Sequence, residues 1–394
     1  MLENTNKKIY FYFVPETYED KREYPHMAIA LGEGLKKLGI ELYSNENYWR
    51  IEPNKEEYLF KHDPQVKAED CSIVVLNHEW FWPAERSIPE NLFRSDRTYK
   101  TVLIDNFESN KRHRHLAFDP EFGGKFDFIF KAHCGSKFNY PDNCIPWGFG
   151  LSERIIREVA DVPNFNKRKQ ELVVNYRNSI FTNKKTGRKV DLTHTVRRAI
   201  KEKFEPAIDS LIPINNKVNS SQQSPVDPYH YLKWVQTGKR HYPDYYQRLQ
   251  NSMACACFGG WFVPFFLKNP GGKFSTICLS VSRRINLKSH KVLQWDSWRL
   301  WESWGAGCVT FHLDFEKYGF MLPVMPENWK HYIGVDLDNV QDTIDRIKDE
   351  PEILAKIAKE GRKWSFEYYS PKPVAKRFLE IVGERNLIPQ LEQV

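Results

Sequence analysis

Short apolar runs that alternate with helical or loop segments constrain the fold of this chain more than any other feature. Five such runs occur in the first half, at 9–14, 40–43, 71–76, 101–104 and 126–130. Between the first two, residues 26–38 carry apolar side chains at helical spacing, and Gly39 is a typical helix end. Strands that alternate with helices predict parallel pairing through right-handed crossovers, so the first half is predicted to be a Rossmann-like α/β domain.

A second alternating series begins at 171–177, after a polar stretch that contains Pro163 and several basic residues. The predicted boundary lies in that stretch, which gives an N-terminal domain over 1–160 and a C-terminal domain over 168–370. No G-x-G-x-x-G motif follows the first strand. The sequence therefore lacks the signature of a dinucleotide-dependent dehydrogenase.

The net charge and the cysteines limit the kinds of ligand and the cellular compartment that fit this chain. The net charge of +7 over 394 residues fits an anionic ligand such as a nucleotide sugar, a nucleic acid or a lipid surface, without selecting among them. The seven cysteines form no C-x-x-C pair, which favours reduced thiols and disfavours zinc. No apolar run approaches the roughly 20 residues of a membrane span. We expect a cytoplasmic protein without a transmembrane segment, and a peripheral association with a membrane is left open.

The tryptophan-rich segment 294–311 carries the most specific signal. Asp296 is a good N-cap residue, and Gly305 ends the predicted helix before a buried strand. The helix N-terminus at Ser297 offers free backbone N–H groups to a phosphate, and Arg299 adds a guanidinium. Glu302 shares a helix face with Arg299 and can accept hydrogen bonds from a ribose diol. An ordinary surface ion pair beside a core face is the alternative interpretation.

The pattern Arg299-x-x-Glu302-x-x-Gly305-Ala306-Gly307 resembles the donor-site motif of B-type (GT-B) glycosyltransferases, of the family 1/4-like kind. The tail from 338 to 369 is similar to the closing helices of that superfamily. The resemblance implies two Rossmann-like domains facing across a cleft, with the C-terminal segment 371–394 crossing back to the N-terminal domain. It also implies a hexosyltransferase-like enzyme that is independent of metal and needs no cofactor beyond its nucleotide-sugar co-substrate.

Gln294 stands where the family's E-x7-E pattern has its first glutamate. This departure leaves the donor sugar open, together with retention or inversion of the anomeric configuration. By the same resemblance, Glu302 is expected to be the ribose ligand. A D-x-D sequence at 336–338 precedes a predicted helix, so we interpret it as a helix cap and predict no metal ligands.

Further donor-site candidates follow predicted strands of the second half. Arg177 and Arg283 are placed where such folds bind ligands, and both also fit solvated loops. Gly259 and Gly260 would allow a nucleotide to approach the backbone closely, or would simply form a turn.

The N-terminal half is expected to supply the acceptor side. Asp105 and His78 follow predicted strands, and one of them is expected to be the general base of an inverting enzyme. A helix cap or a packed histidine is the alternative for each. The expected acceptor is a hydroxyl of a carbohydrate, a lipid-linked compound or another molecule.

Two other functions remain open from the sequence. The basic run 111–115 suggests a modified nucleic acid as acceptor, which is not favoured. The missing first glutamate suggests a non-catalytic module that binds a nucleotide or a sugar.

Overall fold

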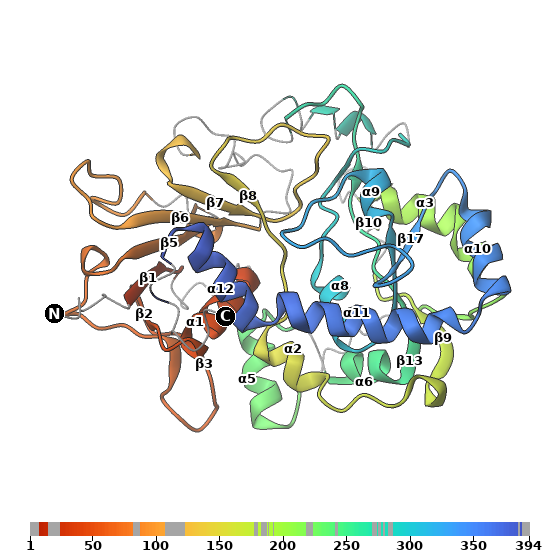
Figure 1. Ribbon diagram of the computed structural model, residues 1–394, viewed down its shortest axis with the longest axis horizontal. Coiled ribbons are helices and arrows are strands. Elements are labelled where there is room, and N and C mark those ends of the chain that lie inside the picture. The colour runs from red at the N-terminus through yellow and green to blue at the C-terminus, as the bar shows by residue number, and fades with distance from the viewer. Residues whose placement is uncertain are drawn as a thin grey trace.

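The computed structural model describes residues 8–14, 24–81, 87–106, 123–176, 180–182, 187, 189–191, 193–217, 224–240, 243–269, 274, 277–278, 280–282, 287–384 and 387. Within these ranges the chain forms two α/β domains, which lie side by side in Figure 1. The N-terminal domain runs from red to yellow, and the C-terminal domain from green to blue.

The N-terminal domain is built on a parallel six-stranded sheet with the order β2-β1-β5-β6-β7-β8. Its strands are β1 (Lys8–Tyr12), β2 (Glu41–Ser44), β5 (Ile73–Asn77), β6 (Lys100–Asp105), β7 (Phe128–Lys131) and β8 (Cys144–Pro146). Helix α1 (His26–Lys37) connects β1 to β2 and is followed by Gly39 at φ +78°, as its spacing predicts. A small hairpin of β3 (Tyr48–Arg50) and β4 (Tyr58–Phe60) lies outside this sheet.

The C-terminal domain is built on a parallel five-stranded sheet with the order β12-β9-β13-β16-β17. Its strands are β9 (Lys169–Val173), β12 (Ile214–Asn215), β13 (Ser252–Ala256), β16 (Val309–Leu313) and β17 (Ile333–Val335). Two antiparallel pairs lie outside it: β10 (Ile180–Thr182) with β11 (Lys189–Asp191), and β14 (Trp261–Phe262) with β15 (Val292–Leu293).

The other described α-helices lie between and after these strands. They are α2 (Glu153–Glu158), α3 (Thr195–Lys203), α4 (Glu205–Ile208), α5 (Pro228–Gln236), α6 (Pro243–Asn251), α8 (Trp298–Gly305), α9 (Phe315–Tyr318), α10 (Val340–Asp349), α11 (Ile353–Tyr369) and α12 (Pro371–Ile381). In the part of the chain that is described, no helix has the length and apolarity to cross a bilayer.

The last helix returns to the first domain. Helix α11 runs along the C-terminal domain, and α12 then lies against α1, as Figure 1 shows. A Cβ on Gly34 of α1 would stand 1.9 Å from the carbonyl oxygen of Pro371 and 2.8 Å from the Cβ of Ala375. Only glycine permits this separation of the two helices. The predicted fold class, two Rossmann-like domains with a C-terminal helix crossing back, is confirmed.

A leucine at Gly34 is therefore expected to push α12 away from α1 and to destabilise the protein by about 1–3 kcal/mol, the usual cost of overpacking. Thermal unfolding measures this loss. Gly124→Ala is the matched control, because a Cβ there meets nothing within 4 Å. Equal unfolding temperatures for Gly34→Leu and the control would contradict the close packing of the two helices.

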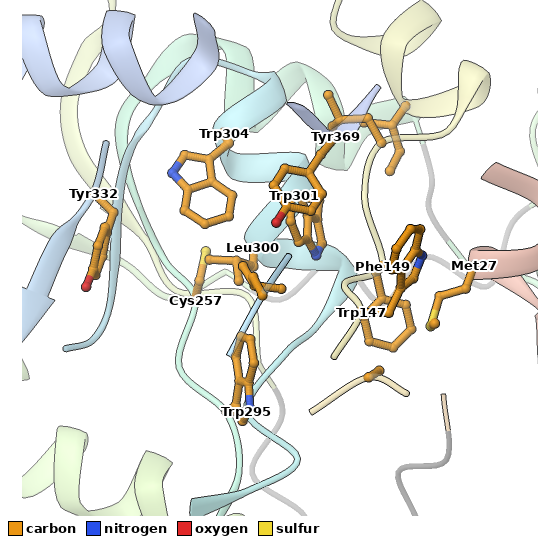
Figure 2. Close-up of a cluster of buried hydrophobic side chains, with 14 of the residues drawn as sticks. Met27, Trp147, Phe149, Cys257, Trp295, Leu300, Trp301, Trp304, Tyr332 and Tyr369 are labelled. Atoms are coloured by element: carbon orange, nitrogen blue, oxygen red, sulfur yellow. The ribbon is translucent and has the colours of Figure 1, made fainter. Parts of the chain in front are cut away.

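Aromatic side chains from both domains form a continuous core at the junction (Figure 2). Trp295, Trp301 and Trp304 of the C-terminal domain are each 0% exposed. Trp147 and Phe149 reach them from the segment that leaves the N-terminal sheet. A Cβ on the intervening Gly148 would stand 2.7 Å from the Trp301 ring. This core holds the start of α8 at the boundary between the domains.

Candidate functional site

Helix α8 lies where the carboxyl end of β13 meets the N-terminal domain. It starts after an extended residue, Ser297 (φ −162°, ψ 155°), and its end is followed by Gly307 at φ +63°. Leu300, Trp301 and Trp304 are 0% exposed, so this face of the helix is core. Arg299 and Ser297 are only partly buried. The apolar face of α8 therefore packs into the core, and the side chains of its first turn lie at the domain boundary.

Arg299, in that first turn, has a side chain that forms no hydrogen bond and no ion pair with any described residue, and its Nε is buried from solvent. Burial lowers the pKa of Arg299, but the nearby Tyr245 phenol, the Cys257 and Cys255 thiols and Glu302 outweigh it, so the pKa is raised. The guanidinium is therefore charged at neutral pH. A cation with unused donors at a helix N-terminus is suited to hold an anion.

A second guanidinium, which the sequence did not single out, lies beside the first. The guanidinium carbons of Arg197 and Arg299 stand 5.1 and 6.0 Å from the centroid of the Tyr176 ring. Arg197 donates from Nε to the carbonyl of Phe258, 3.0 Å away, and Tyr176 donates to Glu205 at 2.6 Å. Arg197 is in the first turn of α3 and Tyr176 follows β9. The position of Tyr176 just beyond β9 is a signal for a ligand site, whereas no local signal marks Arg197.

The start of α8 is tied to the N-terminal domain by Asp296. Its Oδ2 accepts the Phe149 N–H at 3.1 Å, and its Oδ1 accepts Ser297 N–H and Trp301 Nε1–H at 2.7 and 2.9 Å. The Asp296 N–H donates to Nδ1 of His133 at 3.1 Å. The predicted N-cap role of Asp296 is wrong, because Ser297 occupies that position.

Ser297 leaves the helix N-terminus without a side-chain cap. Its hydroxyl forms no capping hydrogen bond, and Oγ is buried with no partner among the described residues. The backbone N–H groups of the first turn of α8 are thus uncapped, and the unused Ser297 hydroxyl lies two residues before Arg299. An uncapped helix N-terminus beside a guanidinium is suited to bind a phosphate, and phosphate binding here stays a prediction.

Glu302 is placed differently from the expectation of a ribose ligand. Its side chain is 2% exposed, and Oε1 accepts the Tyr246 hydroxyl at 2.7 Å. Arg154 of α2, also 2% exposed, lies 3.9 Å from the same oxygen and donates to the Tyr246 hydroxyl at 2.7 Å. In this conformation the carboxylate stabilises a buried cation at the domain junction and is not open to a ligand.

A buried carboxyl of α1 lies near this network. Glu33 accepts the Glu153 N–H at 2.7 Å, and burial raises its pKa from 4.5 to about 8. The folded chain keeps this proton up to about pH 8, whereas the unfolded chain releases it near pH 4.5. The stability that depends on this proton is therefore fully present below pH 4.5 and declines as the pH rises to 8.

Glu33→Gln keeps the amide-accepting oxygen and removes this titration. The variant is expected to lose less stability than the wild type between about pH 5 and about pH 8. Urea unfolding at several pH values in that window compares the two slopes. Parallel slopes would show that Glu33 does not titrate as its burial requires.

The two glycines after β13 differ in their surroundings. Gly260 has φ +104°, and a Cβ on it would stand 2.6 Å from the carbonyl oxygen of Leu293. The close approach predicted for Gly260 is thus to strand β15. A Cβ on Gly259 would stand 3.6 Å from the Gln294 carbonyl and 3.9 Å from the Arg197 guanidinium, so Gly259 borders the basic pair. Arg177, Arg283 and the run 111–115 lie outside the described residues.

The residues predicted for the acceptor side are at strand ends, but they are buried. Asp105 ends β6, is 1% exposed and pairs with Lys131 Nζ of β7 at 2.8 Å. His78 follows β5, is 2% exposed and lies 3.7 Å from the Glu79 carboxylate. The loop after Lys131 carries His133, which contacts Asp296. This end of the N-terminal sheet therefore faces the start of α8.

The D-x-D sequence is occupied by cations of the protein. Lys317 Nζ donates to both oxygens of Asp336 at 2.6 Å and to Asp338 at 2.9 Å, and His290 Nε2 is 2.7 Å from Asp338. Asn339 occupies the N-cap position of α10, without a capping hydrogen bond from its side chain. The predicted cap role of the D-x-D sequence is wrong, because both carboxylates belong to this ion-pair cluster.

No protein-family model matches the sequence, and no curated protein sequence matches it. Among solved structures, the chain is similar to an alpha-glucosyltransferase in complex with UDP, with a TM-score of 0.48, 9% identity and coverage of 95% of this chain and 99% of that chain. It is also similar to an alpha-glucosyltransferase in complex with UDP-glucose and DNA containing an abasic site (TM-score 0.46, 10% identity, 95% and 98% covered). A third is a glycosyltransferase from Rickettsia africae ESF-5 (TM-score 0.40, 12% identity, 97% and 99% covered). At such low scores and identities, these likenesses assign neither a family nor a substrate to this chain.

Proposed function

We propose that the protein is a glycosyltransferase that moves a sugar, a hexose by preference, from a nucleotide-diphosphate donor to an acceptor hydroxyl. The observation that carries the proposal is the charged, part-buried Arg299, whose side chain has no hydrogen-bonding or ionic partner among the described residues. The neighbouring groups keep the guanidinium charged, but no described residue accepts a hydrogen bond from it. A ligand diphosphate would accept from these donors.

The donor side of the proposal uses three groups of the C-terminal domain. The diphosphate lies against the uncapped N-terminus of α8, where Arg299 and the Ser297 hydroxyl donate to it. Arg197 adds a second positive charge from α3, beside the same tyrosine ring. Glu302 holds Arg154 and Tyr246, and so positions α8 rather than binding the ribose.

The chemistry requires that negative charge be stabilised on the leaving group. The acceptor oxygen forms a bond to the anomeric carbon, the bond from that carbon to the diphosphate oxygen breaks, and the acceptor proton is released. Two guanidinium groups and a helix N-terminus offset the charge that develops on the diphosphate. We propose that these groups make a metal ion unnecessary.

The acceptor enters from the N-terminal domain, beside the loop that carries His133. Asp105 and His78 stay the predicted candidates for a general base. Both side chains are buried in this conformation. Either could act as the base only if a conformational change exposed it to the acceptor. Lys131 Nζ also donates to Asp105 Oδ2 at 2.8 Å, so an acceptor hydroxyl would compete with this contact.

Release of nucleoside diphosphate from a panel of nucleotide sugars, with EDTA present, tests the function. We expect the wild type to release nucleoside diphosphate slowly from one donor into water and faster with a hydroxyl acceptor. Arg299→Gln is expected to abolish both reactions. Tight nucleotide binding without turnover of any donor would instead assign a non-catalytic binding module.

A further inference from the structure

The excursion between β14 and β15, residues 263–291, exposes an unusual number of large apolar side chains. Nine large hydrophobic residues are exposed among the described residues, and five of them lie in this one segment. They are Phe265 (81% exposed), Phe266 (53%), Phe274 (58%), Ile277 (60%) and Val281 (47%). Scattered apolar residues need no explanation, but a local group of them marks an interaction surface.

The other face of the excursion is anchored to the protein. Val263, Leu267 and Cys278 are buried in a cluster with Phe138 of the N-terminal domain. The Asn139 N–H donates to the Lys268 carbonyl at 2.9 Å. Since Val263 and Leu267 are packed on either side of them, Phe265 and Phe266 stand on a folded base.

The same segment is strongly basic. Between Phe262 and Leu293 the sequence contains six basic residues and no Asp or Glu: Lys268, Lys273, Arg283, Arg284, Lys288 and Lys291. Lys268 and Lys288 are exposed, and neither ammonium group pairs with a described residue. Burial lowers the pKa of Lys137, and repulsion from Lys291 and Lys317 lowers it further. The charges of Lys268 and Lys288 are therefore not neutralised by a described residue, whereas Lys317 is paired with Asp336 and Asp338.

A hollow joins the apolar and basic groups. It has a volume of about 690 Å³, and its lining includes Phe265, Phe266 and Val281 together with Lys203, Lys288 and Lys291 and one carboxylate, that of Asp338. Apolar side chains beside lysines fit a partner with an apolar interior and an anionic surface layer. A nucleic acid would satisfy the lysines, and its bases could stack on the phenylalanines, but it would leave the exposed aliphatic side chains of Ile277 and Val281 uncovered.

We propose that this face, defined by Phe265, Phe266, Ile277, Val281, Lys268 and Lys288, docks on an anionic lipid bilayer. The phenylalanines enter the boundary between headgroups and acyl chains, and the lysines lie at the level of the anionic headgroups. This inference rests on the excursion alone and does not depend on the proposed transferase activity.

Co-sedimentation of the full chain with vesicles tests the proposal. We expect binding to vesicles of phosphatidylcholine with phosphatidylglycerol, weaker binding to phosphatidylcholine alone, and release as salt is raised. The double variant Phe265→Ser, Phe266→Ser is expected to lower the partition coefficient about ten-fold or more. Lys268→Glu with Lys288→Glu is expected to abolish the preference for anionic vesicles.

Val226→Ser is the matched control, because Val226 is 99% exposed and lies outside the excursion. It should bind vesicles as the wild type does, and all variants should keep the wild-type unfolding temperature. Three results would overturn the proposal: no vesicle binding by the wild type, equal binding by the phenylalanine variant, or a wild-type dimer without vesicle binding that this variant converts to monomer.

Discussion

Replacing Arg299 with glutamine is expected to weaken binding of a nucleoside diphosphate by roughly 10- to 100-fold, which corresponds to the about 1.5–3 kcal/mol of a charge-assisted hydrogen bond. The ligand-free variant is expected to unfold at the wild-type temperature or above it. The reason is that Arg299 forms no ion pair or hydrogen bond with a described residue, so its removal breaks no such contact. Calorimetric titration and thermal unfolding measure the two effects.

Two further variants make this result specific. Arg299→Lys keeps the charge and loses the planar fork, so it is expected to bind with intermediate affinity. Arg346→Gln removes the same charge from the exposed face of α10, where Arg346 covers the Trp329 ring at 4.2 Å. It should bind like the wild type. Equal affinities for the wild type and Arg299→Gln would remove Arg299 from the site.

Replacing Glu302 with alanine is expected to produce the largest loss of stability, about 3–5 kcal/mol. The change leaves Arg154, which is 2% exposed, without its carboxylate and removes the acceptor of the Tyr246 hydroxyl. For a domain of this size the unfolding temperature should fall by roughly 6–20 °C. Thermal unfolding of Glu302→Ala beside the exposed control Glu367→Ala gives the comparison.

A double variant separates pairing from packing. Arg154→Met with Glu302→Leu removes both charges, and it is expected to be more stable than Glu302→Ala because no buried charge is left unpaired. If Glu302→Ala instead unfolds at the wild-type temperature and loses only nucleotide binding, Glu302 is the ribose ligand that the sequence motif implies.

The alternation of apolar runs and helices was sufficient to predict two parallel α/β domains, but the short strands β8, β12 and β17 were not predicted. Runs such as 71–76 and 101–104 became neighbouring parallel strands, β5 and β6. Local signals also placed Arg299 in the first turn of a helix and Gly305 at its end. These features depend on side chains within one or two turns of one another, which is the range over which periodicity and capping act.

Contacts between distant parts of the chain were not predictable in this way. Helical spacing paired Glu302 only with Arg299. In the structure Glu302 accepts from Tyr246, which lies 56 residues earlier in the chain, and it pairs with Arg154 of the N-terminal half. The sequence analysis explained Gly260 by the close approach of a ligand. The structure shows that strand β15, which is distant from Gly260 in the sequence, approaches it instead. Arg197 belongs to a helix rich in basic residues, and only its position beside Tyr176 distinguishes it.

Calorimetric titration with nucleoside diphosphates and with the matching nucleosides tests the central claim most directly, because the two ligands differ only in the group that Arg299 is proposed to hold. The account predicts that at least one diphosphate binds the wild type far more tightly than its nucleoside, and that Arg299→Gln removes this difference. Equal binding of diphosphate and nucleoside, or an unchanged preference for the diphosphate in Arg299→Gln, would contradict it.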